Sequence, residues 1–290
     1  MSKSKCLVIF FIILLLFSSN LNCVNAKSEK IYYRNKIIVL TYHNVSPQKL
    51  TRLTITPERF ESDIMLLREK GFNFVSLRQT IDAINGKGKI PANAVLITFD
   101  DGLKGFYKHA MPIIKKYRIP TVNFVITSRI KNNATKDSIS MNTEEIKDVI
   151  STGLVEIQSH THASHDYIYI NENLDKRSKL AYRAYDPVKK TIERQNDFEN
   201  RIYNDLVESR KILKDEFGIE SDTLCFPFGH YNKKVIDEAK KAGFKYFVTT
   251  ERAANVLASK SNKLYRLPAG YSDLSSKEVL NEILKYGSLK

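Results

Sequence analysis

The stretch "VLITFDDGLKGF", residues 95–106, decides how the rest of the chain is interpreted. Its first five residues are apolar or β-branched, which predicts a buried strand, and they run directly into two adjacent aspartates, Asp100 and Asp101. Neighbouring carboxylates repel each other unless a cation or a shared proton compensates their charge. The pair is therefore either a solvated loop or half of a metal site, and the other motifs of the chain have to decide between the two.

Predicted strands alternate with predicted helices along the chain. We expect strands at 36–42, 72–77, 94–99, 121–127, 154–158, 223–226, 244–249 and 264–267. The intervening helices include one that opens at Pro57 and stops before Gly71, and others at 77–84, 106–117 with a break at Pro112, 142–151, 197–217, 232–242 and 276–286. Residues 166–195 are polar without a clear period and are interpreted as an excursion with loop character. The alternation implies a parallel sheet, most simply a closed or nearly closed β/α barrel.

Polar clusters follow the carboxyl ends of several predicted strands. They are His43, Asp100-Asp101, the segment "SHTHASH" at 159–165, and Pro227-Phe228-Gly229. In a β/α barrel these strand ends share one face, and that face carries the active site. We therefore expect the four clusters to meet.

The N-terminal segment 1–26 has the pattern of a secretory signal. Lys3 and Lys5 precede an apolar run at 6–17, and Val24-Asn25-Ala26 offers a cleavage site. The run is shorter than a comfortable membrane span, although an uncleaved anchor is the alternative. We expect one domain over 27–290, secreted or associated with the cell surface.

Charge and cysteine content restrict the partners. Without Lys3 and Lys5, 44 of the 46 basic residues remain against 32 acidic ones, a balance of +12 that suits an anionic cell wall or membrane surface. No nucleic-acid recognition motif is present, and an export signal argues against nucleic acid as a partner. The mature chain keeps only Cys225, so an intramolecular disulfide is excluded. We expect a monomer.

The histidines are concentrated near one strand end. Three of the six, His160, His162 and His165, fall within six residues. One aspartate with two histidines matches the ligand preference of zinc, and three protein ligands leave a position open for water. A solvated loop would not explain why the histidines and the aspartates both end strands.

Three motifs resemble the polysaccharide deacetylases of carbohydrate esterase family 4 over most of 36–270. They are "TFDDG" at 98–102, the pair His160-Thr161 followed by His165, and "FPFG" at 226–229. The resemblance implies a distorted (β/α)7 barrel in which Asp101, His160 and His165 bind a divalent metal, usually zinc, with cobalt or nickel as alternatives. It also implies that Asp100 is the catalytic base, and it makes 27–290 a polysaccharide deacetylase domain.

Two departures from the usual pattern narrow the resemblance. His160 and His165 are five residues apart instead of four, and no histidine follows His230 to supply a late catalytic acid. Both features resemble the poly-β-1,6-N-acetylglucosamine deacetylases of biofilm bacteria, in which a strand ending in Tyr-His supplies the acid, and Tyr42-His43 fits. A deacetylase of peptidoglycan or chitin, and a glycan-binding barrel without turnover, are the alternatives.

The same resemblance assigns further roles. The backbone N–H of Phe228 would meet the oxyanion, and Tyr42, Pro227 and Gly229 would contact a polysaccharide that contains N-acetylglucosamine. Cys225 stands where the family often has an arginine that braces the catalytic aspartate, and Arg266 is a candidate replacement. Because the chain has no Trp, sugar stacking would fall to Tyr or Phe. His162 is an alternative metal ligand, and His109 and His230 are assigned to the surface or the surroundings of the site.

Overall fold

The main sheet has ten strands and is mostly parallel. The computed structural model describes residues 30–130 and 139–288, so the predicted signal segment 1–26 lies outside the described residues. Within the compact unit 31–290, the sheet runs in the order β14 (Asn255–Val256), β1 (Lys36–Tyr42), β5 (Ala94–Phe99), β6 (Thr121–Val125), β7 (Val155–Ser159), β12 (Thr223–Cys225), β13 (Tyr246–Val248) and β15 (Lys263–Leu264).

A divided last strand nearly closes this sheet into a barrel. β15 pairs with β13, and after Tyr265 and Arg266 the chain continues as β16 (Leu267–Pro268), which pairs in parallel with β1. The segment 263–268 therefore lies beside β13 at its start and beside β1 at its end. Counting β15 and β16 as one position gives seven parallel positions, so the predicted distorted (β/α)7 barrel is confirmed.

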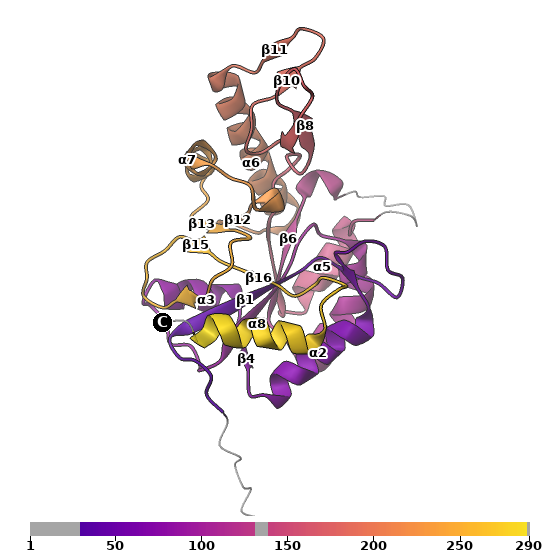
Figure 1. Cartoon of the computed structure of the whole chain (residues 1–290), viewed down its shortest axis with the longest axis vertical. Coiled ribbons are helices and arrows are strands. Elements are labelled where there is room, and N and C mark those ends of the chain that lie inside the picture. The colour runs from indigo at the N-terminus through magenta and orange to yellow at the C-terminus, as the bar shows by residue number, and fades with distance from the viewer. Residues whose placement is uncertain (1–29, 131–138, 289–290) are drawn as a thin grey trace, which may run out of the picture. The chain divides into compact units, whose positions relative to one another are not determined.

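Helices connect most of the parallel strands, and one more helix follows the last strand of the chain (Figure 1). They are α2 (Pro57–Glu69), α3 (Leu77–Ile84), α4 (Met111–Tyr117), α5 (Thr143–Ser151), α6 (Gln195–Phe217), α7 (Lys233–Lys241) and α8 (Ser276–Ser288). Shorter turns of helix are η2 (Phe106–Ala110), η3 (Thr127–Arg129) and η4 (Pro227–Gly229). None of the helices in the described part of the chain is both long enough and apolar enough to span a membrane.

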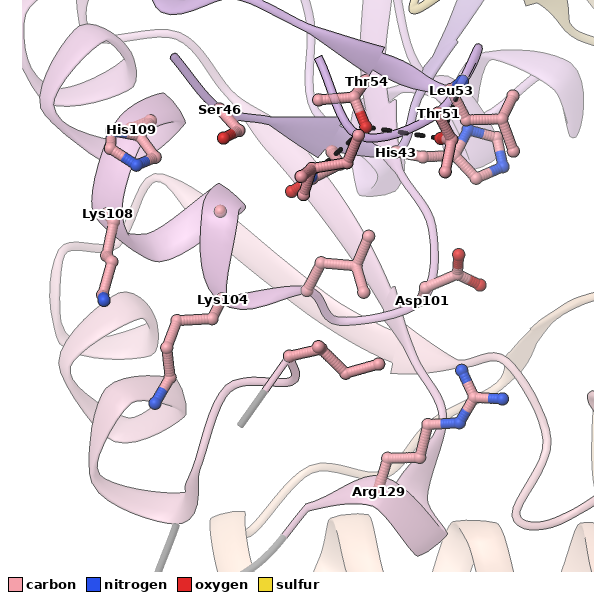
Figure 2. A pocket seen from close by; sticks show the side chains of 15 residues that line it. His43, Ser46, Thr51, Leu53, Thr54, Asp101, Lys104, Lys108, His109 and Arg129 are labelled. Atoms are coloured by element: carbon pink, nitrogen blue, oxygen red, sulfur yellow. Dashed lines mark hydrogen bonds between the residues drawn. The ribbon is translucent and has the colours of Figure 1, made fainter. Parts of the chain in front are cut away.

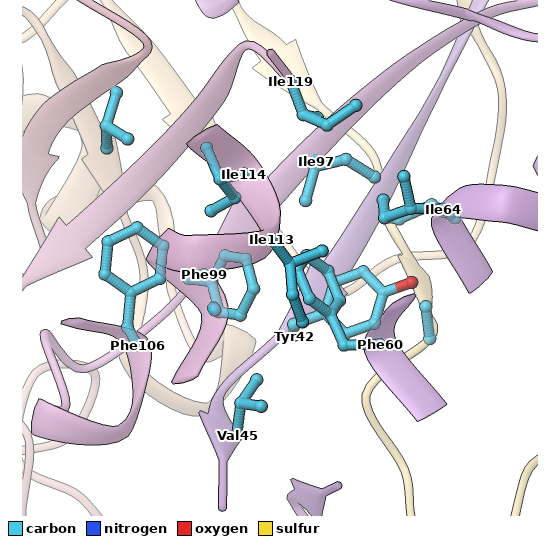
Figure 3. Close-up of a cluster of buried hydrophobic side chains, with 14 of the residues drawn as sticks. Tyr42, Val45, Phe60, Ile64, Ile97, Phe99, Phe106, Ile113, Ile114 and Ile119 are labelled. Atoms are coloured by element: carbon cyan, nitrogen blue, oxygen red, sulfur yellow. The ribbon is translucent and has the colours of Figure 1, made fainter. Parts of the chain in front are cut away.

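Alternation along the strands separates two layers of the core. Ile37 and Val39 of β1 belong to a cluster with residues of β5, β6, β12 and β13, which fills the barrel. Leu40 and Tyr42 belong to the outer cluster under the helices, where the Tyr42 ring packs against Phe60 and Phe99, with centroids 5.2 and 5.4 Å away (Figure 3). Burying each such large side chain contributes about 1.5–3 kcal/mol.

Several predicted elements differ from the observed ones. The strand expected at 72–77 is only β4 (Asn73–Phe74), and the antiparallel β14 was not predicted. The helix expected at 106–117 contains a π-helical turn, η2, before α4. A further short parallel pair joins β2 (Asn44–Val45) to β3 (Thr54–Ile55).

The segment 166–195 is more regular than predicted. It contains two antiparallel pairs, β8 (Tyr167–Tyr169) with β9 (Lys176–Ser178) and β10 (Tyr185–Asp186) with β11 (Thr191–Ile192). These strands are too short for a period to be visible in the sequence. They lie beside α6 in Figure 1, which begins at Gln195.

Candidate active site

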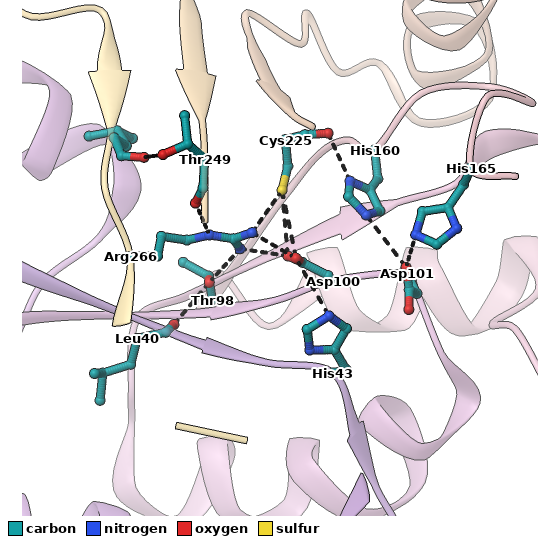
Figure 4. Close-up of polar contacts among 11 residues, drawn as sticks. Leu40, His43, Thr98, Asp100, Asp101, His160, His165, Cys225, Thr249 and Arg266 are labelled. Carbon is teal, nitrogen blue, oxygen red and sulfur yellow. Dashed lines mark hydrogen bonds and ion pairs between the residues drawn. The ribbon is translucent and has the colours of Figure 1, made fainter. Parts of the chain in front are cut away.

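The strand register brings the polar clusters together at one end of the barrel (Figure 4). β1 and β5 pair Tyr42 with Phe99, so the next residues, His43 and Asp100, are neighbours. β6 and β7 pair Val125 with Ser159, and the His160 N–H donates to the Val125 carbonyl at 2.9 Å. The expectation that these strand ends share one face is confirmed.

Asp101 faces two imidazoles. Its Oδ1 lies 3.1 Å from His165 Nε2 and 3.5 Å from His160 Nε2. One donor atom from each of the three residues lies within 4.8 Å of the other two. Burial opposes ionisation of Asp101, but hydrogen bonds and charge from the two histidines hold its pKa well below the usual range. The structure therefore gathers the three residues that the motifs predicted as metal ligands.

The tautomer of His160 indicates that this group fits a cation. His160 Nδ1 lies 2.8 Å from the Cys225 carbonyl oxygen, which can only accept, so Nδ1 carries the proton. In the neutral ring Nε2 then carries a lone pair, and this lone pair faces the carboxylate of Asp101. Two lone pairs pointing at each other need a proton or a metal ion between them, and a backbone partner on the far nitrogen is the usual support of a ligating histidine.

A second group of potential ligands fits a metal less well. Asp100, His160 and Cys225 also place their donor atoms within 4.8 Å of one another, and all three are buried. However, the Arg266 guanidinium already contacts the Asp100 carboxylate and the Cys225 thiol, and burial raises the pKa of that thiol. A neutral thiol beside a resident cation is a poor site for a metal ion.

Asp100 is held by Arg266 in a buried bidentate pair. Arg266 Nη1 and Nη2 donate to the two carboxylate oxygens at 2.7 and 2.8 Å, and both residues are at most 3% exposed. Burial opposes ionisation of Asp100, but the charge and hydrogen bonds of Arg266 outweigh it, so the pKa of Asp100 lies below its usual value. Arg266 in turn donates to Thr98 and to the Thr249 carbonyl.

Arg266 therefore braces Asp100, the role for which the sequence analysis named it as the candidate replacement of the missing arginine. It lies between β15 and β16, where the divided strand crosses from β13 to β1. Cys225 is fully buried in the barrel cluster, with its sulfur 3.7 Å from each oxygen of Asp100.

His43 reaches Asp100 from the opposite side. Its Nε2 lies 3.9 Å from Asp100 Oδ2, and its buried Nδ1 has no hydrogen-bond partner among the described residues. Burial lowers the pKa of His43 below its ordinary value, although the charges of Asp100 and Asp101 act in the other direction. His43 is thus placed beside the predicted base, with its imidazole only partly exposed.

A cavity of about 500 Å³ opens beside these residues (Figure 2). His43 and Asp101 lie at one end of it, and the rest of its lining comes from β2, the loop 46–53, the start of β3, the segment 103–105, η2, η3 and Ile139. Its volume falls within the range of ordinary ligand pockets.

An aromatic stack of Phe228 and Tyr167 lies against His165 of the metal-ligand group. The Phe228 ring lies 4.4 Å from the His165 ring and 4.5 Å from the Tyr167 ring, measured between centroids. Tyr167 is 52% exposed and stacks on Phe228 at an interplanar angle of 30°. Sequence reasoning expected Tyr or Phe to replace Trp in sugar stacking but did not single out Tyr167, because no motif surrounds it.

The remaining predicted residues divide into several outcomes. The side chain of Tyr42 is fully buried and donates to Asp63, so the prediction that it contacts substrate is wrong. Pro227 is buried, and a Cβ on Gly229 would lie 1.9 Å from Thr250, so any role of Pro227 and Gly229 at the substrate stays a prediction.

The other histidines lie outside the group around Asp101. His162 contacts the Thr127 hydroxyl through Nδ1 at 3.0 Å. His109 lines the far part of the cavity beyond His43, and His230 lines a separate pocket with Tyr231.

Comparison with known proteins identifies the family. A profile described as polysaccharide deacetylase matches residues 87–247, which is more than half of the chain. The chain belongs to the polysaccharide deacetylase family. The resemblance inferred from the three motifs is thereby confirmed, as is the predicted enzyme class, a hydrolase of amide bonds in the N-acetyl groups of a polysaccharide.

Relatives of this polysaccharide deacetylase carry one name in two organisms. A poly-beta-1,6-N-acetyl-D-glucosamine N-deacetylase of Staphylococcus aureus strain MRSA252 is 29% identical over 248 residues, covering 81% of this chain and 78% of the relative. The protein of the same name from Escherichia coli K12 is 26% identical, over 77% of this chain but only 35% of the relative.

Solved structures share the fold. A de-N-acetylase from Aggregatibacter actinomycetemcomitans superposes with a TM-score of 0.78 at 24% identity, covering 85% of this chain and 99% of that one. IcaB from Ammonifex degensii gives a TM-score of 0.70 at 24% identity, covering 87% and 98%.

Proposed function

We propose that this polysaccharide deacetylase hydrolyses the N-acetyl groups of poly-β-1,6-N-acetylglucosamine with the help of a divalent metal ion. The observation that carries the proposal is the different surroundings of two adjacent aspartates, one paired with Arg266 and the other facing two imidazoles. This arrangement provides a base and a metal ligand on consecutive residues. The curated relatives of the same name support the substrate.

Asp101, His160 and His165 would hold the metal. One carboxylate and two imidazoles favour zinc, with cobalt and nickel as alternatives. A divalent ion bound there would lower the pKa of a coordinated water and polarise the acetyl carbonyl. The chain's own residues have to supply every proton transfer.

Asp100 is the proposed general base. Its carboxylate is ionised and held in one orientation by the two hydrogen bonds from Arg266. It would take a proton from the attacking water as that water adds to the acetyl carbon, a role that requires a fixed, unprotonated oxygen. The backbone N–H of Phe228, whose side-chain ring lies 4.4 Å from the His165 ring, is the proposed donor to the oxyanion that develops on the carbonyl oxygen.

His43 is the proposed general acid. An amine leaves poorly unless its nitrogen is protonated, and His43 Nε2 lies on the side of Asp100 opposite Arg266 (Figure 4). Burial lowers the pKa of His43, so the protonated imidazole gives up its proton more readily. The negative charges of Asp100 and Asp101 act in the other direction and favour the protonated form. Nε2 would give its proton to the amine nitrogen as the carbon–nitrogen bond breaks.

We also propose that the enzyme acts outside the membrane, near an anionic surface that suits its positive balance. Each acetyl group removed exposes an amine, so the polymer gains positive charge and is retained by such a surface.

The test is acetate release from β-1,6-linked N-acetylglucosamine oligomers, compared with chitin oligomers and peptidoglycan. The enzyme is first stripped with a chelator and then assayed with zinc, cobalt or nickel added back. A preference for the β-1,6 oligomers is expected. A preference for either β-1,4 substrate would contradict the assigned polysaccharide, and full activity in verified metal-free protein would contradict the mechanism.

A further inference from the structure

The cavity next to the candidate active site has a cationic wall, which we define as Lys104, Lys108 and Arg129. All three line the cavity that also contains His43 and Asp101. In Figure 2, Arg129 extends on the side of Asp101, and Lys104 and Lys108 come from the side of η2. Among the residues that the structure describes, Asp101 is the one acidic residue that lines the cavity, and its charge is assigned to the metal.

Two of these three cations have no carboxylate partner in the described part of the chain. Lys104 contacts Glu145 at 3.5 Å, but no ion pair among residues 30–130 and 139–288 involves Lys108 or Arg129. Within the described ranges, Arg129 donates to the carbonyl oxygen of His165 at 3.4 Å, and Lys108 is exposed. The cavity therefore presents net positive charge to whatever enters it.

A neutral N-acetylglucosamine unit carries no charge, so its binding does not require the cationic wall. The enzyme's own product does carry charge, since each deacetylated unit has an amine that is largely protonated near neutral pH. A unit of this kind, when placed in the cavity beside the unit being hydrolysed, would be repelled by Lys108 and Arg129, and less strongly by Lys104, whose charge Glu145 partly offsets.

We propose that the cationic wall forms a subsite that rejects deacetylated, positively charged sugar units and accepts N-acetylated or anion-bearing ones. This inference rests on the proposed function and deepens it. It follows that an acetyl group next to an existing amine is a poor substrate, so the enzyme leaves amines spaced along the polymer.

The size of the effect follows from Coulomb's law. At a separation of about 6–8 Å in water, one unit charge changes binding by about two- to threefold, so the two unpaired cations and the partly offset charge of Lys104 together amount to on the order of tenfold. Salt reduces this discrimination because the wall is open to solvent and the Debye length is only about 10 Å at 0.1 M ionic strength.

The experiment compares three β-1,6-linked pentamers by kcat/KM for acetate release. The first is fully N-acetylated, the second carries one free amine next to an acetylated unit, and the third carries a carboxylate-bearing acyl group on that same amine. The zinc-loaded wild-type enzyme should prefer the first over the second by about tenfold and use the third at least as well as the first.

Lys108→Glu tests the wall directly. Lys108 is exposed and has no ion-pair partner among the described residues, so its replacement breaks no ion pair there and should leave the fold intact. The variant should narrow the ratio between the first two pentamers by about fivefold, since it changes the local charge by two units. The matched control is Lys211→Glu on α6, also exposed and outside the cavity, which should leave the ratio unchanged.

Equal rates on the first two pentamers, or a wild-type ratio that survives Lys108→Glu at low salt, would overturn the inference while leaving the deacetylase activity standing. Absence of acetate release from all three pentamers would overturn the proposed function, and the subsite with it.

Discussion

Asp100 and Asp101 are consecutive residues with the same side chain, yet the fold compensates their charges in opposite ways. Asp100 is buried against the guanidinium of Arg266, a cation that belongs to the chain. Asp101 lies beside two imidazoles and opens to the cavity, with no guanidinium or ammonium group among its ion-pair partners in the described residues. The difference teaches that a charge balanced internally suits a base, whereas a charge left for an external cation suits a metal ligand.

The backbone explains how neighbours reach such different surroundings. Side chains alternate along a strand, so Asp100 continues the interior row of Leu96 and points into the barrel. Asp101 then adopts a φ of 75°, followed by Gly102 at 67°, which turns the chain out of the strand. A Cβ at Gly102 would lie 3.0 Å from Val125, so a larger residue there would move the turn that aims Asp101.

The largest expected effect on acetate release comes from replacing Asp101, the aspartate assigned to the metal. Asp101→Asn should bring bound metal to a small fraction of the wild-type content and lower acetate release by about 10³-fold or more, because both the metal and its coordinated water are lost. Metal content is measured by elemental analysis beside the assay. Retention of stoichiometric metal by this variant would show that the ligand assignment is wrong.

Replacement of Asp100, the proposed base, should lower turnover without loss of the metal. Asp100→Asn should lower turnover by about 10²- to 10⁴-fold, the range of general-base catalysis, while metal content stays close to that of the wild type. The two asparagine variants are each other's controls, since they make the same change at adjacent positions. Loss of metal from the Asp100 variant alone would mean that the two roles are reversed.

Removal of the proposed acid should follow in size. His43→Gln should lower turnover by about 10²-fold with metal retained, because the leaving amine is no longer protonated. His109→Gln is the control, since His109 lines the same cavity away from Asp101 and should change turnover only slightly. A wild-type rate for His43→Gln would return the role of acid to another group.

The brace on Asp100 should have a smaller effect on catalysis. Arg266→Lys keeps the positive charge but cannot make both hydrogen bonds to the carboxylate, so we expect turnover to fall by about tenfold with metal unchanged. Arg266→Gln also leaves a buried carboxylate unpaired and should lower the free energy of unfolding by about 3–5 kcal/mol, measured by urea denaturation. If Arg266→Lys matched the wild type in turnover, charge alone would suffice and the orientation argument would fail.

The smallest effect is expected at the aromatic stack. Tyr167→Ala should raise KM for the oligomers by about three- to tenfold with kcat nearly unchanged, because a stacking surface for a sugar ring contributes binding of about 1 kcal/mol. Tyr167→Phe keeps the ring and should behave as the wild type. An unchanged KM in the alanine variant would exclude Tyr167 as a sugar contact.

Local patterns in the sequence were sufficient to predict much of the molecule. The strand at 94–99 and its two terminal aspartates were evident from apolar residues followed by charge, and the alternation of strands and helices predicted the barrel. Once parallel strands were expected, their shared face followed, so His43, the pair Asp100-Asp101 and the histidine segment 159–165 could be grouped without coordinates. The resemblance to the deacetylase family then singled out Asp101, His160 and His165 as the metal ligands. The outward direction of Tyr42 could also have been found, because it shares the alternation of Ile38 and Leu40.

Only the tertiary structure decided which distant side chains complete the site. Arg266 and Asp100 are 166 positions apart, and they meet because the divided strand 263–268 crosses from β13 to β1 and closes the barrel there. Tyr167 reaches Phe228 through a hairpin whose strands are three residues long. Periodicity reports the face on which a residue lies within its own element, whereas barrel closure and loop packing determine what that face meets, and those depend on the whole chain at once.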